Sequence, residues 1–383
     1  MSLPTPSYAA LEHSQQFLSH LKEKFAPMQS ISFEEWMGEA LYNPYWGYYT
    51  GGLTKLSGDN ETSILQGDFT TAPELSPWYG RTLAIQVQQV LTAAESSHIL
   101  EFGAGSGKLA RAVLEQLANP NLHYFILELS ADLRLRQQET LKDYLHQVTW
   151  LDALPNDFSG CILANEVLDA IPVKLVQWNK AQELEEVFVS WEDGELSYQY
   201  HPASTELATI LQNRLPAYPG YRTEVNLRAE SWIREMGNYL KKGAVLLIDY
   251  GFPRSEYYHP QRHQGTLMCH LQHHAHSEPL LYPGLQDITA HVDFTAVADA
   301  ALDGNLEVLG FTSQARFLMN CGILSLLKQL DPSDVKDYAR QIGPVQKLLS
   351  EAEMGELFKV MMLGKDLDID PIGFISGDRR HTL

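Results

Sequence analysis

The sequence predicts an α/β protein built on a parallel β-sheet, and three observations lead to this fold class. Residues 99–107 read Ile-Leu-Glu-Phe-Gly-Ala-Gly-Ser-Gly, an apolar strand that breaks into a glycine-rich turn. Further short apolar runs alternate with helical segments, as parallel strands joined by crossover helices do. Each of these runs ends in an acid or an amide, and ligands of such sheets bind at the carboxyl ends of the strands.

Two helices and an aromatic turn are expected before the sheet. Residues 8–25 have helical spacing, and residues 31–41 form a second helix that Ser32 caps, with Glu35 three residues later. Residues 42–49 are dense in aromatic side chains and broken by proline and glycine. This run is either a packed turn or part of a substrate cleft, in which case Tyr49 lies on the substrate side.

The sheet region begins with a helix over residues 79–93, and an amphipathic helix over 109–117 follows the glycine turn. A hairpin is expected over 186–200 around Asp193-Gly194. Helices are expected over 207–215, 229–240 and the segment 314–349. Strands are predicted at residues 99–102, 124–127, 148–151, 161–164, 245–248, 306–310 and 358–363.

Two segments carry weaker patterns. Residues 252–293 are irregular and rich in Pro, Gly and His, which is typical of a functional insertion or lid. Residues 367–383 form a tail that is either disordered or docked.

The net charge of the chain indicates which classes of binding partner to expect. The net charge is −20, from 48 Asp and Glu against 28 Lys and Arg. Nucleic-acid binding draws on positive charge, so the sequence predicts no nucleic-acid partner. It favours small ligands or a basic protein partner, unless the charge serves only solubility.

The cysteines, the N-terminal residues and the lengths of the apolar stretches indicate the cellular compartment. Cys161, Cys269 and Cys321 are far apart and odd in number, so no disulfide framework or zinc spacing follows. The N-terminal residues have neither a signal-peptide pattern nor an Arg-rich presequence pattern. No apolar stretch approaches the roughly 20 residues that span a bilayer. We expect a cytoplasmic protein without membrane insertion.

The spacing of the glycines indicates the type of ligand. Backbone without side chains approaches a nucleotide closely, so Gly103, Gly105 and Gly107 are candidate cofactor contacts. A dinucleotide fingerprint reads G-x-G-x-x-G, and Lys108 stands where its last glycine would be. An NAD-type oxidoreductase is therefore the weaker alternative. The G-x-G-x-G spacing, with Glu101 two residues ahead, resembles motif I of class I S-adenosylmethionine methyltransferases.

Acids at successive strand ends complete the predicted cofactor site. Glu128 lies at the spacing from the glycines at which a carboxylate accepts from two ribose hydroxyls. Asp152 would accept from an adenine amine, and Glu101 would orient the ligand's ammonium group. Further candidates for the cofactor pocket are Asp68, Thr71, Glu74 and Asn165.

Longer motifs make the resemblance more specific. Across residues 31–365 the chain resembles the MidA family of S-adenosylmethionine-dependent methyltransferases, which includes mitochondrial complex I assembly-factor methyltransferases. The motifs are Ala40-Leu-Tyr-Asn-Pro, Gly47-Tyr-Tyr, Gly67-Asp-Phe-Thr-Thr-Ala-Pro-Glu-Leu-Ser-Pro, Glu101-Phe-Gly-Ala-Gly-Ser-Gly, Ala164-Asn-Glu-Val-Leu-Asp-Ala-Ile-Pro-Val, Ile248-Asp-Tyr-Gly, Gly265-Thr-Leu and Gln286-Asp-Ile-Thr-Ala-His-Val-Asp-Phe.

This resemblance implies a class I, Rossmann-like seven-stranded core and S-adenosylmethionine as cofactor. It implies an N-terminal helical extension with a cofactor loop (residues 1–78), a core (79–365) with a helical or lid-like insertion near 201–242 and 252–294, and a C-terminal tail (366–383). The implied substrate is an arginine of a protein, such as the 49-kDa-type subunit of respiratory complex I. A non-catalytic complex I assembly module is the alternative. The oligomeric state stays open, with a homodimer among the states considered.

The segment after the fourth strand supplies the catalytic candidates. Arginine is a poor nucleophile because its pKa exceeds 12, and paired carboxylates can hold its guanidinium and accept charge as a proton leaves. Glu166 and Asp169, with Asn165 beside them, are placed for this. The alternative is that Asp169 caps a helix and Glu166 is structural.

The last candidates lie near residues 265–294, which we interpret as a substrate-side lid. His291 and Asp293 are expected near the pocket. His270, His273, His274 and His276 cluster, but no H-E-x-x-H spacing is present and the cysteines do not join them. No metal site is predicted.

Overall fold

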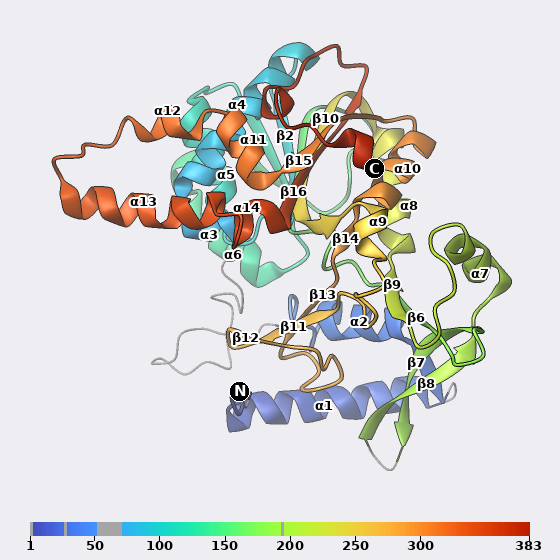
Figure 1. Ribbon diagram of the computed structural model, residues 1–383. Helices are drawn as coiled ribbons and strands as arrows, with labels where there is room; N and C mark the ends of the chain where they lie inside the picture. The colour runs from blue at the N-terminus through green and yellow to red at the C-terminus, as the bar shows by residue number, and fades with distance from the viewer. Residues whose placement is uncertain (1–2, 27–28, 52–70, 193–194) are drawn as a thin grey trace. The chain divides into compact units, whose positions relative to one another are not determined.

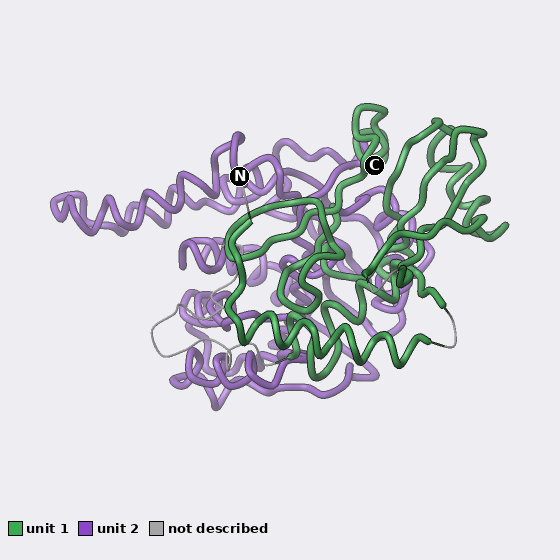
Figure 2. The backbone as a smooth tube through the Cα atoms, turned by 90° about the horizontal axis from the view of Figure 1, so that it is seen from below, with its two compact units in different colours: residues 1–69, 169–229, 254–291 green, residues 70–168, 230–253, 292–383 purple. Residues whose placement is uncertain are grey.

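The computed structural model describes residues 3–26, 29–51, 71–192 and 195–383 (Figure 1). The chain folds into two compact units, each assembled from segments distant in sequence (Figure 2). Unit 1 comprises residues 1–69, 169–229 and 254–291. Unit 2 comprises residues 70–168, 230–253 and 292–383.

The sheet of unit 2 is the predicted α/β sheet. Its described strands follow the order β15-β16-β10-β5-β2-β3-β4, a seven-stranded path, and β14 pairs with β10 beside it. All neighbours from β10 to β4 are parallel, and β16 runs antiparallel to both of its partners. The strands are β2 (His98–Phe102), β3 (His123–Leu127), β4 (Val148–Leu151), β5 (Phe158–Asn165), β10 (Leu240–Phe252), β14 (Val292–Asp293), β15 (Glu307–Ser313) and β16 (Phe358–Lys365).

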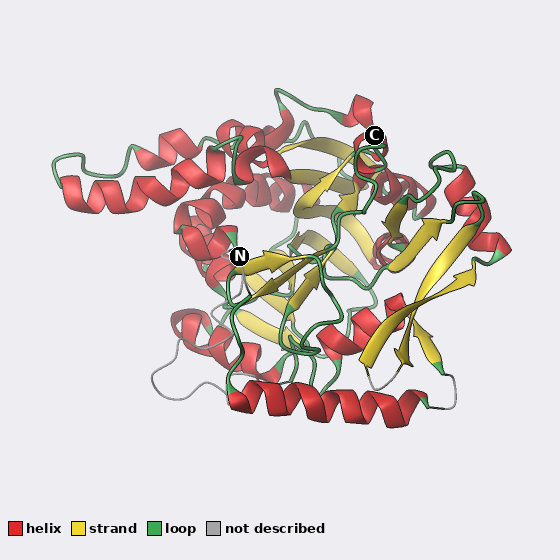
Figure 3. Cartoon of the chain, turned by 60° about the horizontal axis from the view of Figure 1, so that its bottom comes forward, coloured by secondary structure: helices red, strands yellow, loops and turns green. Residues whose placement is uncertain are grey.

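Helices cover this sheet, with α4 and α5 on one side and α8 and α10 on the other (Figures 1 and 3). A Cβ on Gly80 of α4 would lie 2.7 Å from Ala112 Cβ of α5, so a glycine is needed where these two helices meet. The helices are α3 (Ala72–Leu75), α4 (Pro77–Ala94), α5 (Lys108–Leu117), α6 (Ala131–Thr140), α8 (Leu227–Tyr239), α10 (Phe294–Asp303), α11 (Gln314–Asn320), α12 (Ile323–Leu327), α13 (Val335–Leu349) and α14 (Met354–Leu357), with 3-10 turns at Lys142–Tyr144, Ile372–Phe374 and Arg380–Thr382.

The strand register brings the strand ends to one edge of the sheet. Phe102 of β2 pairs with Leu127 of β3 and with Ala164 of β5. Asn165 then pairs with Ile248 of β10. The residues that follow these strands therefore line the same edge, as parallel pairing requires.

The residues after β16 are docked onto unit 2. Gln86 Oε1 of α4 accepts a hydrogen bond of 2.9 Å from the backbone N of Gly373, and Phe374 is buried. The docked alternative for the C-terminal tail is the one that the structure shows.

Unit 1 has a five-stranded sheet with the order β1-β7-β6-β9, in which β8 also pairs with β7. All of its pairings are antiparallel. A three-stranded sheet of order β12-β11-β13 completes the described strands of the unit. The elements are α1 (Tyr8–Phe25), β1 (Ser30–Ser32), α2 (Phe33–Tyr42), β6 (Lys174–Trp178), β7 (Leu184–Glu192), β8 (Glu195–Pro202), α7 (Thr205–Gln212), β9 (Arg222–Val225), α9 (Arg254–Tyr257), β11 (Met268–Leu271), β12 (His274–His276) and β13 (Asp287–Thr289).

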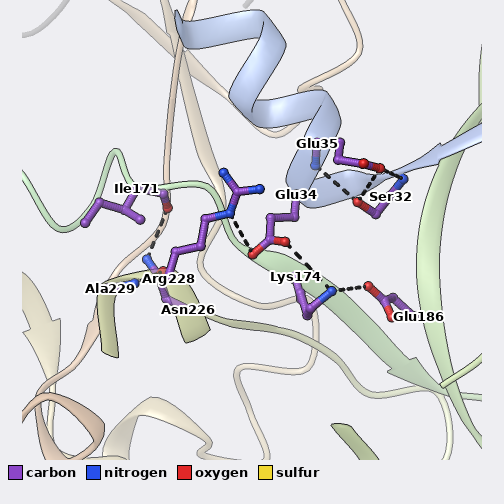
Figure 4. A network of polar contacts seen from close by, with 9 residues as sticks. All are labelled: Ser32, Glu34, Glu35, Ile171, Lys174, Glu186, Asn226, Arg228 and Ala229. Carbon is purple, nitrogen blue, oxygen red and sulfur yellow. Dashed lines mark hydrogen bonds and ion pairs between the residues drawn. The ribbon is translucent and has the colours of Figure 1, made fainter. Parts of the chain in front are cut away.

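Helix α2 begins at the predicted capping box. Ser32 Oγ accepts from the backbone N of Glu35 at 3.2 Å, and Glu35 Oε2 accepts from the backbone N of Ser32 at 3.0 Å (Figure 4). The predicted helix over 31–41 is wrong at its start, because Ile31 pairs with Val189 in the sheet. The helix cannot extend past its N-cap residue, Ser32, and Ile31 pairs with a strand that is distant in sequence.

Glu34 ties the start of α2 to two other segments of unit 1. It contacts Arg228 Nε at 3.2 Å and Lys174 Nζ at 3.8 Å, and Lys174 also lies 2.8 Å from Glu186 Oε1 (Figure 4). Asn226 Nδ2 donates to the carbonyl of Ile171 at 3.1 Å. These contacts fix the segment that leads from residue 169 into β6.

The inserted residues differ from the prediction. Residues 201–242 contain β9 as well as helices, and residues 252–293, predicted as irregular, contain β11, β12 and β13. These strands are three or four residues long. Strand β9 pairs with β6 and β13 with β11, both distant in sequence, while β12 forms a hairpin with β11. So short a run shows no measurable period, and its pairing partner alone makes it a strand.

Candidate active site

The glycine turn after β2 requires its glycines. Gly103, Gly105 and Gly107 have φ of +59°, +53° and +83°, a region that costs other residues about 1–2 kcal/mol. The backbone N of Gly103 donates to Leu127 O at 3.0 Å, and Gly107 is the N-cap of α5. Among the described residues, no atom would lie within 4 Å of a Cβ on Gly105.

Glu101 is a buried acid directly ahead of this turn. Tyr124 Oη donates to its Oε2 at 2.8 Å, and the side chain is 2% exposed. Burial raises the pKa of Glu101 to about 8, against the Tyr124 hydrogen bond, which lowers it, while the charge of Glu128 raises it further. Glu101 therefore holds a proton at neutral pH.

This proton gives a testable pH dependence of stability. A buried acid with a raised pKa stabilises the fold fully below its usual pKa of 4.5, and loses that contribution as pH rises to about 8. We expect Glu101→Gln, which stays neutral, to remove part of the decline in unfolding free energy between pH 4.5 and 8. Urea unfolding across that range measures it, and equal slopes for both proteins would contradict it.

The acids after β3 and β4 differ in their surroundings. Glu128 is 6% exposed, and its Oε1 accepts from the backbone N of Ser130 at 3.0 Å. Burial raises its pKa, against the hydrogen bonds that it accepts. The Asp152 side chain is 89% exposed and pairs with Arg134 Nη1 at 2.7 Å. Both residues lie at the predicted sheet edge.

The end of β5 carries Asn165 and Glu166. Asn165 Oδ1 accepts from Tyr79 Oη of α4 at 2.5 Å, and its Nδ2 donates to Glu166 Oε1 at 3.0 Å. Glu166 has φ of +54°, a left-handed conformation that is uncommon for a residue with a side chain. Its backbone N donates to Ile248 O at 2.8 Å, which holds it there. Strained residues of this kind cluster at functional sites.

The segment before the core reaches the glycine turn through Glu74. Its carboxylate accepts from Ser106 Oγ and lies 2.5 Å from Lys108 Nζ. Thr71 is the N-cap residue of α3, without a capping hydrogen bond from its side chain. Asp68 lies outside the described residues.

The remaining predicted residues fall in both units. In unit 1, Tyr49 Oη donates to Asp287 Oδ1 at 2.7 Å, and burial raises the pKa of Tyr49, as does the charge of Asp287. The backbone N of His291 donates to Thr266 Oγ1 at 3.0 Å. In unit 2, Asp293 Oδ1 accepts from the backbone N of Thr295 and Ala296, both at 3.1 Å, so it caps α10.

Asp169 belongs to unit 1 and lies in a turn, so the alternative that it caps a helix is wrong. Its carbonyl accepts from the backbone N of Ala290 at 3.0 Å. Tyr42 Oη donates to the carbonyl of Ala170 at 3.0 Å. The backbone after Asp169 is therefore held by residues from both ends of unit 1's sequence.

Sequence reasoning missed two polar residues of this edge. Asp249 lies within β10, directly after the residue that pairs with Asn165, and its Oδ2 accepts from the backbone N of Leu168 at 2.9 Å. The available signal was that this acid directly follows the strand predicted over 245–248. Tyr79 lies on α4, where only tertiary packing places its hydroxyl against Asn165.

Among the described residues, no group of three or more His, Cys, Asp or Glu side chains is arranged to hold a metal ion. No helix in these same residues is both long and apolar enough to cross a bilayer.

The residues at this edge fit an adenosyl ligand. The glycine turn leaves room for close backbone approach, since within the described part of the chain a Cβ on Gly103 would meet only Val167 Cγ2, at 3.7 Å. Glu128 offers carboxylate oxygens to hydroxyl donors. The strand order, the glycine turn and the acids together define a class I methyltransferase fold.

The chain belongs to the family described as "Putative S-adenosyl-L-methionine-dependent methyltransferase", which it matches over residues 82–312. It is a methyltransferase that uses S-adenosylmethionine as its cofactor.

Solved structures agree with this assignment. A protein from Burkholderia thailandensis bound to S-adenosyl-homocysteine is 45% identical, with a TM-score of 0.93, and the match covers 100% of both chains. A second, native structure from the same organism is 43% identical, with a TM-score of 0.90 and the same coverage. The predicted cofactor is confirmed by this likeness.

Curated relatives are more distant. "Protein arginine methyltransferase NDUFAF7, mitochondrial" from Danio rerio is 27% identical, over 90% of this chain and 86% of its own. The protein of that name from Homo sapiens is 28% identical, over 90% of this chain and 82% of its own.

Proposed function

We propose that this methyltransferase modifies an arginine of a protein substrate. The observation that carries the proposal is that relatives named protein arginine methyltransferases align with 90% of the chain. The acidic and amide side chains at the strand ends are of the kind that bind a guanidinium by charge-assisted hydrogen bonds. A respiratory complex I subunit of the 49-kDa type is the proposed target.

The cofactor contacts are proposed from the geometry of unit 2. The backbone of Gly103, Gly105 and Gly107 would lie against the cofactor, and Glu128 would accept from its ribose hydroxyls. Glu101, Asp152 and Asn165 would contact the remaining polar groups, with Asp68, Thr71 and Glu74 contributed by the preceding segment. When bound, S-adenosylmethionine supplies a methyl group on a sulfonium, which is a good leaving group without further activation.

The protein's contribution to the reaction is then orientation and proton transfer. Glu166 and Asp169, three residues apart in one segment, would hold the guanidinium so that one nitrogen faces the methyl carbon. As the new N–C bond forms, that nitrogen loses a proton, which the Glu166 carboxylate accepts. Asn165 orients Glu166 through its hydrogen bond of 3.0 Å. Tyr49, His291 and Asp293 are proposed on the substrate side.

The test is methylation in a lysate from cells that lack this protein, with a methyl-labelled donor and the purified enzyme. We expect a labelled protein whose digestion and sequencing place the label on an arginine. Label on another residue type would overturn the arginine assignment. Donor binding without transfer to any protein would favour a non-catalytic assembly module.

A further inference from the structure

Helix α6 buries a polar residue at a position where helices of a folded unit usually bury an apolar one. Among the residues of α6, all of them described, Gln137 is the buried one, with 0% exposure. A buried amide is costly unless its polar atoms are hydrogen-bonded. What Gln137 contacts therefore explains why it is tolerated at this position.

Both polar atoms of the Gln137 side chain have hydrogen-bond partners. Its Nε2 donates to the carbonyl of Gly105 and to Glu128 Oε2, both at 3.0 Å. Its Oε1 accepts from Trp150 Nε1 of β4 at 2.8 Å. One side chain thus joins the glycine turn after β2, the acid after β3 and a residue of β4.

The backbone of α6 is also close to the turn. A Cβ added at Gly107 would lie 3.3 Å from Gln137 Cα. The helix and the glycine turn therefore pack without room between them, and a displacement of one would shift the other.

We propose that Gln137 is a positioning residue for the cofactor. It holds the Gly105 carbonyl and the Glu128 carboxylate in one fixed relation, so that the ribose acid and the turn face the ligand together. The inference rests on the ribose role proposed for Glu128. Gln137 acts through these groups and is not itself a ligand contact.

The pKa of Glu128 provides a second way to test the positioning role of Gln137. Burial raises the pKa of Glu128, and hydrogen bonds from the backbone of Ser130, from Gln137 and from the backbone of Leu129 lower it, as does the charge of Arg134. The acid that faces it from β2 is Glu101. Loss of the Gln137 amide would raise the pKa of Glu128, so the ionised, accepting form would disappear at a higher pH.

The experiment is calorimetric titration of Gln137→Met with S-adenosyl-homocysteine between pH 5.5 and 8.5. Methionine is close to glutamine in length and makes none of the three hydrogen bonds. We expect affinity at pH 7.5 to fall by about tenfold or more. We also expect the loss of binding on acidification to begin at a higher pH than in the wild type.

Gln86→Met is the matched control. Gln86 is a buried glutamine of the same unit, but it bonds Gly373 N and Gln89 instead of the cofactor edge. We expect this variant to lose stability while affinity and its pH dependence stay as in the wild type. An equal change in both variants would show a general structural effect and overturn the proposal.

A second substitution keeps the proposal testable if Gln137→Met does not fold. Gln137→Glu preserves shape and the acceptor for Trp150, but removes both donated hydrogen bonds and sets a carboxylate against Glu128. Unchanged affinity and pH dependence in either folded variant would overturn the inference. Glu128→Gln distinguishes the ribose role of Glu128 from the positioning role of Gln137. Normal binding of S-adenosyl-homocysteine by Glu128→Gln would contradict the ribose role. Weakened binding by Glu128→Gln, with normal binding by the Gln137 variants, would contradict the positioning role alone.

Discussion

Glu166→Gln should abolish methyl transfer while leaving cofactor binding intact. Glutamine has the same shape and keeps an oxygen for the hydrogen bond from Asn165, but it cannot take a proton from the attacking nitrogen. Loss of a positioned base typically costs about 10²–10⁴-fold in rate. The measurement is single-turnover transfer of labelled methyl to the substrate found in the lysate assay, together with calorimetry of the cofactor.

The left-handed backbone at Glu166 does not confuse this test. Glutamate and glutamine both carry a Cβ, so the strain at φ of +54° is the same in the two proteins. Glu115→Gln is a suitable control, because Glu115 pairs with Arg81 and Arg111 on the surface of unit 2. Wild-type turnover in Glu166→Gln would remove this residue from the catalytic role.

Gly105→Val should prevent cofactor binding. A valine at φ of +53° carries a backbone cost of about 1–2 kcal/mol or more, and its side chain would project where no described atom lies within 4 Å of the Cβ. We expect affinity for S-adenosyl-homocysteine to fall by at least about a hundredfold, since close backbone approach to the ligand is lost. Calorimetry measures the affinity and thermal unfolding measures the stability.

Gly322→Val is the control that separates backbone strain from the loss of close approach to the cofactor. Gly322 has φ of +83°, lies in the same unit and, like Gly105, would have no described atom within 4 Å of an added Cβ. The substitution there brings comparable backbone strain at the start of α12, a segment that is not among the proposed cofactor contacts. It should destabilise the protein and bind normally, and an equal loss of binding in both variants would contradict the cradle role of Gly105.

The sheet edge at which we propose that the cofactor binds could be predicted because its signals are local. The glycine turn needs a backbone conformation that few residues adopt, and Glu128 directly follows an apolar strand, so both can be recognised within a few residues. Glu74 was also expected near this edge, and its contacts with Ser106 and Lys108 bring it there. Asp249 directly follows the strand predicted over 245–248 and could have been assigned on the same reasoning.

The strands of unit 1 were harder to predict. Strand β9 is four residues long and β13 three, so neither shows a period. Each is a strand because distant residues pair with it, as Lys174 of β6 does with Val225. The role of the Asp293 side chain was equally hard to predict. Its carboxylate caps α10, and the neighbouring residues in the sequence did not indicate this.

The amino-acid sequence alone is enough to predict the α/β class, the glycine turn, the acids that follow the strands and the capping box of α2, because each depends on neighbours within one turn or one strand. The folded chain was needed to see that Gln137 bonds Gly105, Glu128 and Trp150 at once, and that Tyr79 meets Asn165. These contacts join residues on different elements, and long-range packing alone sets the distances between such elements.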